Sequence, residues 1–436
     1  MKKFSIAFSI FVAISIFGAL TSCAPKARDS NKTTFTFATW AAGQELKEFQ
    51  EIIDRVNADA NGEYTVTVLS VPSDYYIKIS TLIASKKTPD FFWLSQELIS
   101  RYAQLGAIAD ISEKFAASTR LRPDEFYEGV LSSASFQGKY WGLPWIANPL
   151  MVYYNKRLFD EAGISHPGAL GDWTWDEFIE TAKKLTFLRK DTLGNDYRQY
   201  GCIVDGWPNI ETFIWAGGGD IIAKDGIGIT LDDEAALRGL DILHTILSSG
   251  ITPEYSRVSS LGSNNVWFEK QRAAMFMGGI QDNFEQKNAA MPAEAQFEIG
   301  YAPLPVGLDG KSWSFDWTAS TVLSQGMADN PLAYEVLEKL TLEFFKWKVA
   351  PPLKGAVAHV TQIDPLKEAA LPTIERVLEN ARSANYVPEW NEINNLLWVK
   401  LYTGMLNDTG FDYRASAKSI AEQARVFVGK RKVAND

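Results

Sequence analysis

The sequence predicts an α/β fold in which helices flank mostly parallel strands, and three observations favour it. Residues 35–38 and 64–69 have the β-branched and aromatic composition of strands. Residues 44–57 and 75–84 each follow one of these strands and repeat apolar side chains with the period of a helix. Residues 90–94 are apolar enough for a short buried strand, and a β-α-β-α-β order is typical of a parallel sheet covered by helices.

The loops after the first and third of these strands carry aromatic and polar side chains. Trp40 and Gln44 follow the first strand, and Ser95 and Gln96 follow the third. Because ligands of open parallel sheets bind beyond the carboxyl ends of the strands, we expect these four residues to meet at one rim of the sheet.

A second α/β pattern begins after residue 150. Thr174 and Glu177 are spaced as a capping box, which predicts a helix that continues to about residue 185. The glycines at 217–219 predict the end of a helix over residues 211–216. The remaining expected elements are a helix over 234–247, strands over 297–303 and 317–323, and mainly helix from residue 331 onward.

The first 22 residues have the layout of a secretory signal peptide. Two lysines precede an apolar run over residues 4–20, and small residues lie just before Cys23. A cysteine in this place resembles the bacterial lipobox, which implies that Cys23 becomes the lipidated first residue of the mature chain. Residues 23–33 are polar and aperiodic, so we expect a flexible tether there. A plain signal peptide and an uncleaved anchor helix are the alternatives.

Composition and charge argue against several classes of function. The net charge is −10, and removal of residues 1–22 deletes two lysines and gives −12. Such a charge repels a phosphate backbone, so we expect no nucleic-acid partner. The three histidines are far apart and not at ligand spacing, so we expect no metal site and no cofactor. If Cys23 is acylated, Cys202 is the remaining thiol and no internal disulfide can form.

Catalysis is the alternative that the sequence supports least. No P-loop, GxSxG or HExxH motif occurs in the chain. The glycines at 217–219 follow a helix, whereas anion sites precede one, so the end of a helix is the better interpretation. Asp205, Asp282 and Asp316 lie near aromatic residues and could form a glycosidase pair, but isolated acids are too common to predict an enzyme.

Tryptophan is the strongest indication of a ligand. Of the 14 in the chain, several lie at strand ends or in loops beside glycine, proline or asparagine. Core packing explains Trp215, Trp347 and Trp398, which lie within helical stretches. Trp40 and Trp317 instead favour a cleft in which indole rings stack on the apolar face of a sugar, while amides and acids bind its hydroxyl groups.

Eight segments, in the same order, resemble the sugar-binding solute receptors of bacterial ABC importers, the family of maltose-binding protein. The segments are TPDFFW (88–93), YAQLG (102–106), GKYWGLP (138–144), YYNKRLFDEAG (153–163), TWDEF (174–178), WAGGGD (215–220), FEKQRAAMFMG (268–278) and APLP (302–305). Each is short, but they follow the order of the family, and the resemblance extends over residues 33–430, almost the whole mature chain.

The resemblance implies a two-lobed periplasmic-binding-protein fold of type II, with a mostly parallel sheet and flanking helices in each lobe and a hinge between the lobes. The expected N-terminal lobe comprises residues 34–143 and 304–356, and the C-terminal lobe residues 144–303 and 357–436. Three segments would cross between the lobes, near residues 138–145, 299–305 and 355–364. Pro144 would then stiffen the first hinge strand.

The resemblance also implies which side chains line the cleft. Tyr154 matches the tyrosine that faces sugar in the maltose-type proteins, and Tyr153 would point into the core. Glu97 lies where those proteins have an acid that binds sugar hydroxyls. Many relatives have a tryptophan where this chain has Gln281 and Asp282, and the bulky rim around Trp317 could replace that ring. The full expected set is Trp40, Gln44, Glu45, Ser95, Gln96, Glu97, Asn148, Tyr154, Trp207, Gly217, Gln281, Asp282 and Trp317.

We therefore expect a monomeric, lipid-anchored receptor outside the cytoplasm that captures a sugar or oligosaccharide by hinge closure and delivers it to an ABC permease. A different solute is the open alternative. The loops lack the arginines that a phosphate would need, whereas a polyamine would suit the acids Glu45, Glu97, Asp282 and Asp316 with their aromatic neighbours. A secreted glycosidase is the alternative outside the binding class.

Overall fold

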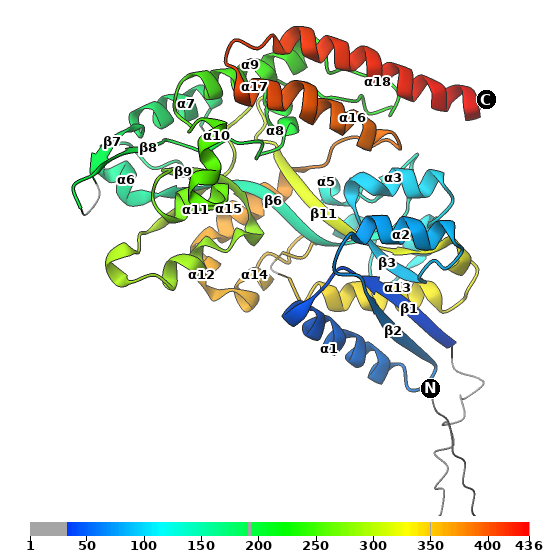
Figure 1. Cartoon of the computed structure of the whole chain (residues 1–436). Coiled ribbons are helices and arrows are strands. Elements are labelled where there is room, and N and C mark those ends of the chain that lie inside the picture. The colour runs from blue at the N-terminus through cyan, green and yellow to red at the C-terminus, as the bar shows by residue number, and fades with distance from the viewer. Residues whose placement is uncertain (1–32, 172, 191–192, 349, 436) are drawn as a thin grey trace, which may run out of the picture.

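The computed structural model describes residues 33–171, 173–190, 193–348 and 350–435. The chain forms two lobes joined by long strands that run through the centre of the molecule, as the resemblance implies (Figure 1). The expected signal peptide, Cys23 and most of the tether lie outside the described residues. Within the described part of the chain, no helix has both the length and the apolar character needed to cross a membrane.

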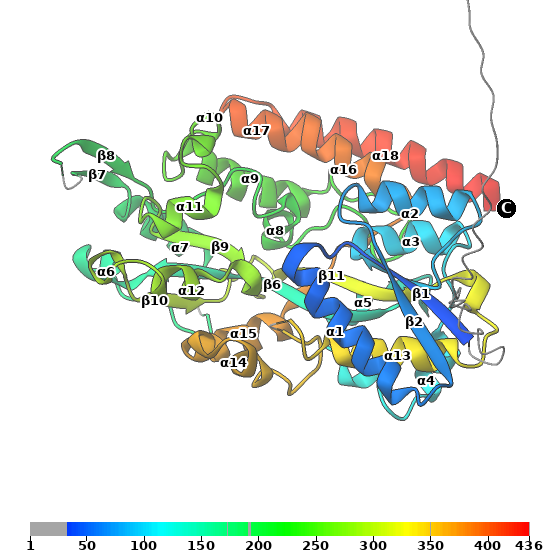
Figure 2. The same cartoon turned by 60° about the horizontal axis from the view of Figure 1, so that its bottom comes forward.

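The N-terminal lobe begins with three parallel strands, which confirms the predicted β-α-β-α-β order. β1 (Thr33–Thr39) lies between β2 (Tyr64–Ser70) and β3 (Phe91–Ser95). Helices cover both faces of these strands: α1 (Gly43–Asp59) and α13 (Ala333–Phe344) on one, α2 (Tyr75–Ala84) and α3 (Gln96–Gln104) on the other (Figure 2).

Alternation along β1 divides the apolar side chains of this lobe between two cores. Phe35 and Phe37 pack on the side of α1, while Ala38 packs on the side of α2. This follows from the strand geometry, because successive side chains point to opposite faces of a sheet. Since both faces are covered, β3 is apolar throughout except for Ser95 at its end.

Two strands connect the lobes. β6 (Leu143–Asn155) pairs with β11 (Ser314–Leu323) over residues 143–149, and β11 in turn pairs with β3. From Leu150 onward β6 pairs instead with β9 (Met275–Gly279) and β10 (Ile299–Ala302) of the C-terminal lobe. One continuous strand therefore belongs to the sheets of both lobes.

The expectation of mostly parallel pairing is wrong around β6. Its pairs with β9, β10 and β11 are all antiparallel, so parallel pairing holds for the first three strands only, apart from the short pair of β11 with β12 (Ala381–Arg382). Sequence periodicity reports whether a segment is a strand and how it is buried, but not the direction of its partner.

The two prolines of β6 lie on opposite sides of the expected hinge. Pro144 pairs with Ser320 within the N-terminal lobe, beside a register shift at which Trp145 is the extra residue of β6, whereas Pro149 lies directly before the change of partners at Leu150. Proline lacks the N–H that a strand partner would accept, which explains its position at such irregular places. The assignment of individual residues to each lobe stays a prediction.

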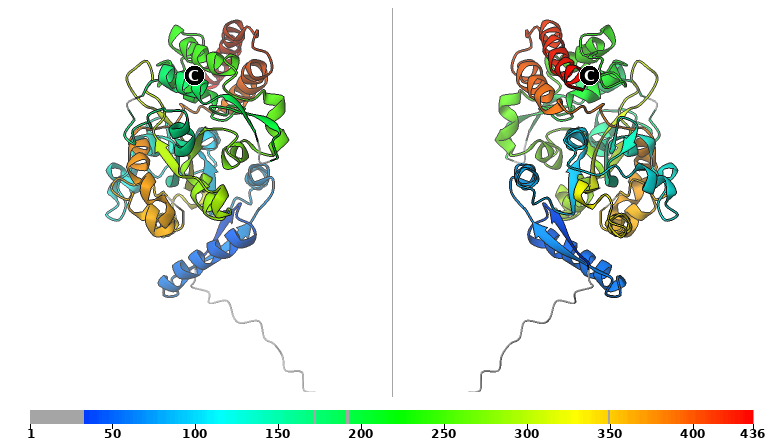
Figure 3. Two further views of the ribbon diagram at one scale, coloured as in Figure 1. Left: turned by 90° about the vertical axis from the view of Figure 1, so that its left-hand side faces the viewer. Right: turned by 90° about the vertical axis from the view of Figure 1, so that its right-hand side faces the viewer.

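The C-terminal lobe packs helices around the antiparallel strands β9, β6 and β10. Its larger helices are α7 (Trp175–Lys184), α8 (Ile210–Ala216), α9 (Glu234–Ser248), α15 (Leu371–Glu379), α16 (Trp390–Leu396), α17 (Thr403–Asn407) and α18 (Tyr413–Asn435). Seen from either end, the last helices lie at the opposite end of the molecule from α1 and β2 (Figure 3).

Shorter elements fill the connections. They are α4 (Ser112–Ala117), α5 (Glu128–Ser132), β4 (Ser135–Phe136), β5 (Lys139–Tyr140), α6 (Lys156–Glu161), β7 (Phe187–Lys190), β8 (Asp196–Gln199), α10 (Tyr255–Val258), α11 (Asn264–Glu269), α12 (Phe284–Ala289) and α14 (His359–Ile363).

Two local predictions in this lobe are confirmed. Thr174 Oγ1 accepts a hydrogen bond from Glu177 N at 3.3 Å, and Glu177 Oε2 accepts one from Thr174 N at 2.7 Å, which completes the capping box of α7. α8 ends at Ala216, and the glycines that follow pack closely on α9: a Cβ atom on Gly217 would lie 2.3 Å from Gly239 N.

Candidate functional site

The crossing of β6 and β11 brings together four of the predicted site residues. Asn148 lies opposite Trp317, and Gln281 N donates a hydrogen bond to Asn148 Oδ1 at 3.0 Å. Asp282 Oδ2 accepts one from Gly279 N at 2.7 Å, at the end of β9. Trp317 is partly buried and packs against the apolar cores of both lobes. This part of the site is therefore built at the hinge itself.

Gly279 lets β9 approach β6 closely enough for these contacts. A Cβ atom at this position would lie 2.4 Å from Asn148 Oδ1, which no relaxed structure permits. The carbonyl of Gly279 accepts a hydrogen bond from the Tyr153 hydroxyl at 2.9 Å. The side chain expected to point into the core, Tyr153, is wholly buried and does so.

Trp40 forms the exposed end of a row of indole rings in the N-terminal lobe. Its ring centroid lies 4.7 Å from that of Trp93, which stacks on Trp145 at 4.6 Å, and Trp347 lies 6.0 Å beyond. Trp40 also contacts the ring of Tyr76 at 6.3 Å. The partly buried Trp40 thus presents an aromatic surface backed by rigid, buried rings.

Gln44 and Glu45 lie apart from this row of indole rings. They lie in the first turn of α1, where Gln44 is exposed and donates to Glu48 at 3.4 Å. Glu45 forms an ion pair with Lys348 at 2.9 Å. The carboxylate of Glu45 is therefore already balanced within the N-terminal lobe.

Gln96 links the two lobes through its side-chain amide. Its Nε2 donates to the Tyr386 hydroxyl at 3.0 Å, and its Oε1 accepts from Ser383 Oγ at 3.2 Å. The same oxygen accepts from the backbone N and the hydroxyl of Thr318 on β11, both at 3.1 Å. One buried residue of α3 thus contacts the crossing strand and the C-terminal lobe together.

Of the residues predicted in the C-terminal lobe, Trp207 lies at the candidate site, whereas Tyr154 and Gly217 do not. Trp207 is partly buried, and its Nε1 donates to the Met277 carbonyl at 2.9 Å. Tyr154, which was expected to face the ligand, is 4% exposed and packs against Phe159 inside this lobe. Gly217 instead allows α8 and α9 to pack closely, as described above.

Three carboxyl groups act electrostatically on Tyr386, and we call Glu97, Glu211 and Asp316 the interlobe carboxylates; Glu211 and Asp316 are buried, and Glu97 is partly buried. Burial raises the pKa of Glu97 and raises that of Asp316 well above its usual range. Burial, with smaller contributions from the charges of Asp220 and Glu97, raises the pKa of Glu211 to about 7. Burial raises the pKa of the Tyr386 hydroxyl well above its usual range, and all three carboxylates add to that rise.

Glu97 and Asp316 each accept one hydrogen bond, from a side-chain hydroxyl and from a backbone N–H respectively. Ser95 Oγ donates to Glu97 Oε1 at 2.5 Å, and Asn148 N donates to Asp316 Oδ1 at 2.7 Å. These bonds lower the pKa of each carboxyl group, but less than burial raises it.

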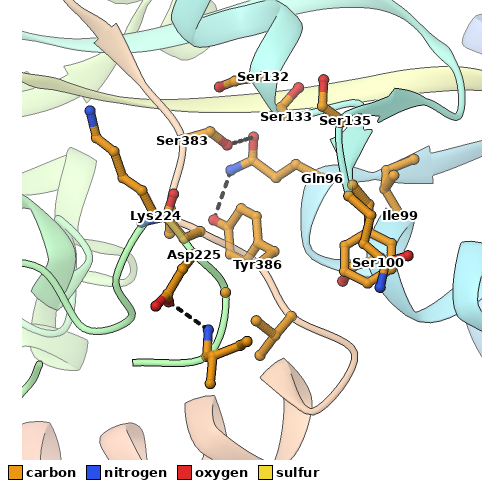
Figure 4. A pocket seen from close by; sticks show the side chains of 18 of the residues that line it. Gln96, Ile99, Ser100, Ser132, Ser133, Ser135, Lys224, Asp225, Ser383 and Tyr386 are labelled. Atoms are coloured by element: carbon orange, nitrogen blue, oxygen red, sulfur yellow. Dashed lines mark hydrogen bonds between the residues drawn. The ribbon is translucent and has the colours of Figure 1, made fainter. Parts of the chain in front are cut away.

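A cavity of about 370 Å³ lies between the lobes beside Gln96 and Tyr386 (Figure 4). Its N-terminal wall comes from α3 and from the segment that joins α5 to β5, with hydroxyl groups at Ser132, Ser133 and Ser135. Its C-terminal wall is formed by the loop 224–227 and the segment 383–387. Most of the polar groups on these walls are uncharged donors and acceptors.

Two contributors to the site, Glu211 and Tyr386, were not predicted from the sequence, and one core assignment, that of Trp398, is wrong. Glu211 is an acid in a seven-residue helix whose every residue is buried, and a charged residue among apolar ones could have signalled it. Tyr386 lies in an irregular segment with no local signal. Trp398, assigned to core packing, is instead 41% exposed in the π-helical turn Leu397–Tyr402, with its ring against Gly206.

No group of three or more potential metal ligands gathers anywhere in the described ranges of the chain. The side chains gathered at the crossing and the cavity are amides, hydroxyls, aromatic rings and carboxylates, which are groups that bind polar molecules.

Comparison with known proteins agrees with this architecture. A binding protein of Brucella abortus (strain 2308) is 25% identical over 381 residues, which are 84% of this chain and 87% of that protein. The sugar-binding protein MalE of Xanthomonas citri superposes with a TM-score of 0.74 at 20% identity, covering 92% of this chain and 99% of that structure. A substrate-binding protein of Listeria monocytogenes, solved with cycloalternan, superposes with a TM-score of 0.69 at 21% identity, covering 91% and 99%.

These structural likenesses show a two-lobed binding-protein fold. The family described as bacterial extracellular solute-binding protein matches residues 40–343, from the loop after β1 to the end of α13. With most of both lobes inside the match, this chain belongs to the bacterial extracellular solute-binding protein family.

Proposed function

We propose that this protein captures a sugar or small oligosaccharide between its lobes and delivers it to the transmembrane subunits of an ABC importer. The observation that carries the proposal is the meeting of polar groups from both lobes at Gln96, Tyr386 and Ser383, beside an interlobe cavity. Trp40 and Trp317 supply aromatic surface near the same crossing. The named relatives support the ligand class, since one structure holds cycloalternan and another is a sugar-binding protein.

Hinge closure supplies the mechanism. Ligand contacts from both walls exist together only when the lobes are closed, so the ligand favours the closed state by its differential affinity. Changing a closed population from 1% to 99% needs about 5.5 kcal/mol of such preference. Stacking on indole rings and hydrogen bonds to charged groups can provide that amount.

A ligand screen followed by scattering tests this function. The mature chain is screened by thermal shift against mono- and oligosaccharides, and the best ligand is then measured by calorimetry. We expect saturable binding of at least one sugar and a smaller radius of gyration in solution when it is bound. Binding without compaction would contradict the closure mechanism. Release of hydrolysed product would indicate a glycosidase instead.

The membrane anchor is proposed from the sequence alone. Cys23 follows a signal-like segment, so the mature chain would be held outside the cytoplasm by a lipid on this residue. Cys23→Ser should move the protein from the membrane fraction to the soluble fraction without changing its sugar affinity. An equal amount of wild type and variant in the membrane pellet would contradict lipidation.

A further inference from the structure

The interlobe cavity adjoins a second cavity, which lies beside α5 and has a volume of about 410 Å³. Ser132, at the end of α5, and Ser135, at the start of β4, line both cavities (Figure 4). The two cavities therefore meet at these two short side chains. Each volume, about 370 Å³ for the first and about 410 Å³ for the second, lies within the range of small-molecule sites.

The boundary between the cavities is polar and open to solvent. Ser132 is exposed and Ser135 is partly buried. Ser132 Oγ donates a hydrogen bond to Gly129 O at 2.7 Å, and Ser135 Oγ donates one to Leu131 O at 3.2 Å. Because each hydroxyl hydrogen is used within this segment, both oxygens remain available as acceptors. A sugar, whose hydroxyl groups donate, can therefore form hydrogen bonds along the boundary.

The second cavity combines an apolar floor with a polar rim. Phe126 and Leu131 are buried, and the partly buried ring of Tyr140 is fixed by an edge contact with Phe115 at 5.3 Å. The Tyr140 hydroxyl and the exposed Glu128 carboxylate have no partner among the residues that the structure describes. An aromatic ring beside free polar groups suits the apolar face and the hydroxyl groups of a sugar.

The far wall of the second cavity is held to the segment that precedes α5. Lys354 N donates to Glu125 O at 2.8 Å, and Lys354 Nζ donates to Asp124 O at 3.0 Å. The loop 224–227 and the segment 383–387, which close the interlobe cavity, do not line the second cavity. The second cavity is therefore formed without the C-terminal wall that hinge closure brings in.

We propose that the second cavity is a subsite for a further sugar ring. The ligand is then an oligosaccharide that places one ring in the interlobe cavity and continues over Ser132 and Ser135 to the ring of Tyr140. The inference rests on the proposed function, because it extends the sugar site beyond the space between the lobes. Since the second cavity does not depend on closure, the added ring increases affinity without increasing the closure itself.

Sugars that differ only in length provide the test. Glucose is compared with maltose and maltotriose and with cellobiose and cellotriose, and xylose with xylobiose and xylotriose, by calorimetry on the mature chain. In a series that binds, we expect the longer sugars to bind at least about tenfold more tightly than the monosaccharide, because they alone contact Tyr140 and Glu128. The decrease in the radius of gyration should be the same for the short and the long sugars.

Two variants connect the gain with length to the second cavity. Tyr140→Ala should remove the gain and leave the affinity for the monosaccharide unchanged. Glu128→Ala serves the same purpose if circular dichroism shows that the first variant does not fold. Glu113→Ala is the matched control, since this exposed glutamate lies in the first turn of the neighbouring helix α4 and lines neither cavity; it should leave the ratio of affinities unchanged.

The outcomes separate this subsite from the proposed function. Equal affinities for a monosaccharide and its longer counterparts overturn the subsite and leave the sugar receptor standing. A gain with length that survives both Tyr140→Ala and Glu128→Ala overturns the assignment to the second cavity, as does a greater compaction with the longer sugar. Binding of none of these sugars overturns the subsite as well, and the wider ligand screen then decides on the sugar receptor.

Discussion

Two of the regions that bury acidic side chains in the described chain differ in what balances the charge. Inside the C-terminal lobe, the wholly buried Lys367 places its Nζ 2.7 Å from Glu285 Oε2 and 3.9 Å from Asp364 Oδ2. Between the lobes, the interlobe carboxylates have no cation within ion-pair distance in the described chain. The first region supplies its own counter-charge, and the second does not.

The difference determines how each region affects the stability of the protein. An ion pair completed within the chain forms on folding and holds α12 against the turn Pro365–Ala370. An unbalanced buried carboxylate lowers the stability of the ligand-free protein instead. Burial alone therefore does not distinguish the two regions, whereas the presence of a counter-charge does.

Removal of Lys367 is the change with the largest expected effect. Lys367→Met leaves Glu285 and Asp364 buried without a cation, so the free energy of unfolding should fall by about 3–5 kcal/mol. Urea denaturation followed by circular dichroism measures it. The exposed pair Lys190–Asp196 provides the control, since Lys190→Met should change stability by less than about 0.5 kcal/mol. Equal effects of the two substitutions would remove the distinction between the regions.

Neutralising Glu211 should raise the free energy of unfolding, whereas removing Lys367 lowers it. The pKa of its carboxyl is about 7 in the folded chain, against 4.5 for an ordinary glutamate, so its contribution to stability is full below about pH 4.5 and is lost as the pH rises through 7. Glu211→Gln should therefore stabilise the ligand-free protein at pH 8 by about 3 kcal/mol, and by little at pH 4. Urea midpoints at both pH values measure this. An identical pH dependence in wild type and variant would contradict it.

Trp317→Ala should have the smallest effect, and on affinity rather than stability. Its ring packs against both lobes at the crossing, so its loss should weaken binding of the best sugar about tenfold while the protein stays folded. Calorimetry gives the dissociation constant, and circular dichroism reports folding. Trp317→Phe, which keeps an aromatic ring, should retain most of the affinity. An unchanged dissociation constant for Trp317→Ala would exclude the ring from the site.

Local patterns predicted local structure well. The period of residues 44–57, the capping box at Thr174 and the glycines after Ala216 each act over a few residues, and each prediction is confirmed. The direction of β6 was not predictable in this way, because it depends on partners more than a hundred residues away.

The candidate site was likewise predictable only where it depends on residues close in sequence. Loops after β1 and β3 were expected at one rim, and Trp40 and Gln96 do lie in the N-terminal lobe near the crossing. Tyr386 is 290 residues from Gln96, and no short-range pattern links the two. The sequence could include Asn148 and Trp317 in the expected site, but it could not show which acids the chain itself neutralises.

The row of indole rings in the N-terminal lobe has an optical consequence. Successive rings of Trp40, Trp93, Trp145 and Trp347 have centroids 4.6 to 6.0 Å apart, so light absorbed by one is passed rapidly among all of them. The most solvated ring emits at the longest wavelength and collects this energy. Trp40 and Trp347, at the two ends of the row, are partly buried, whereas Trp93 and Trp145 are buried, so the natural fluorescence of the row reports the surroundings of its two ends without any attached dye.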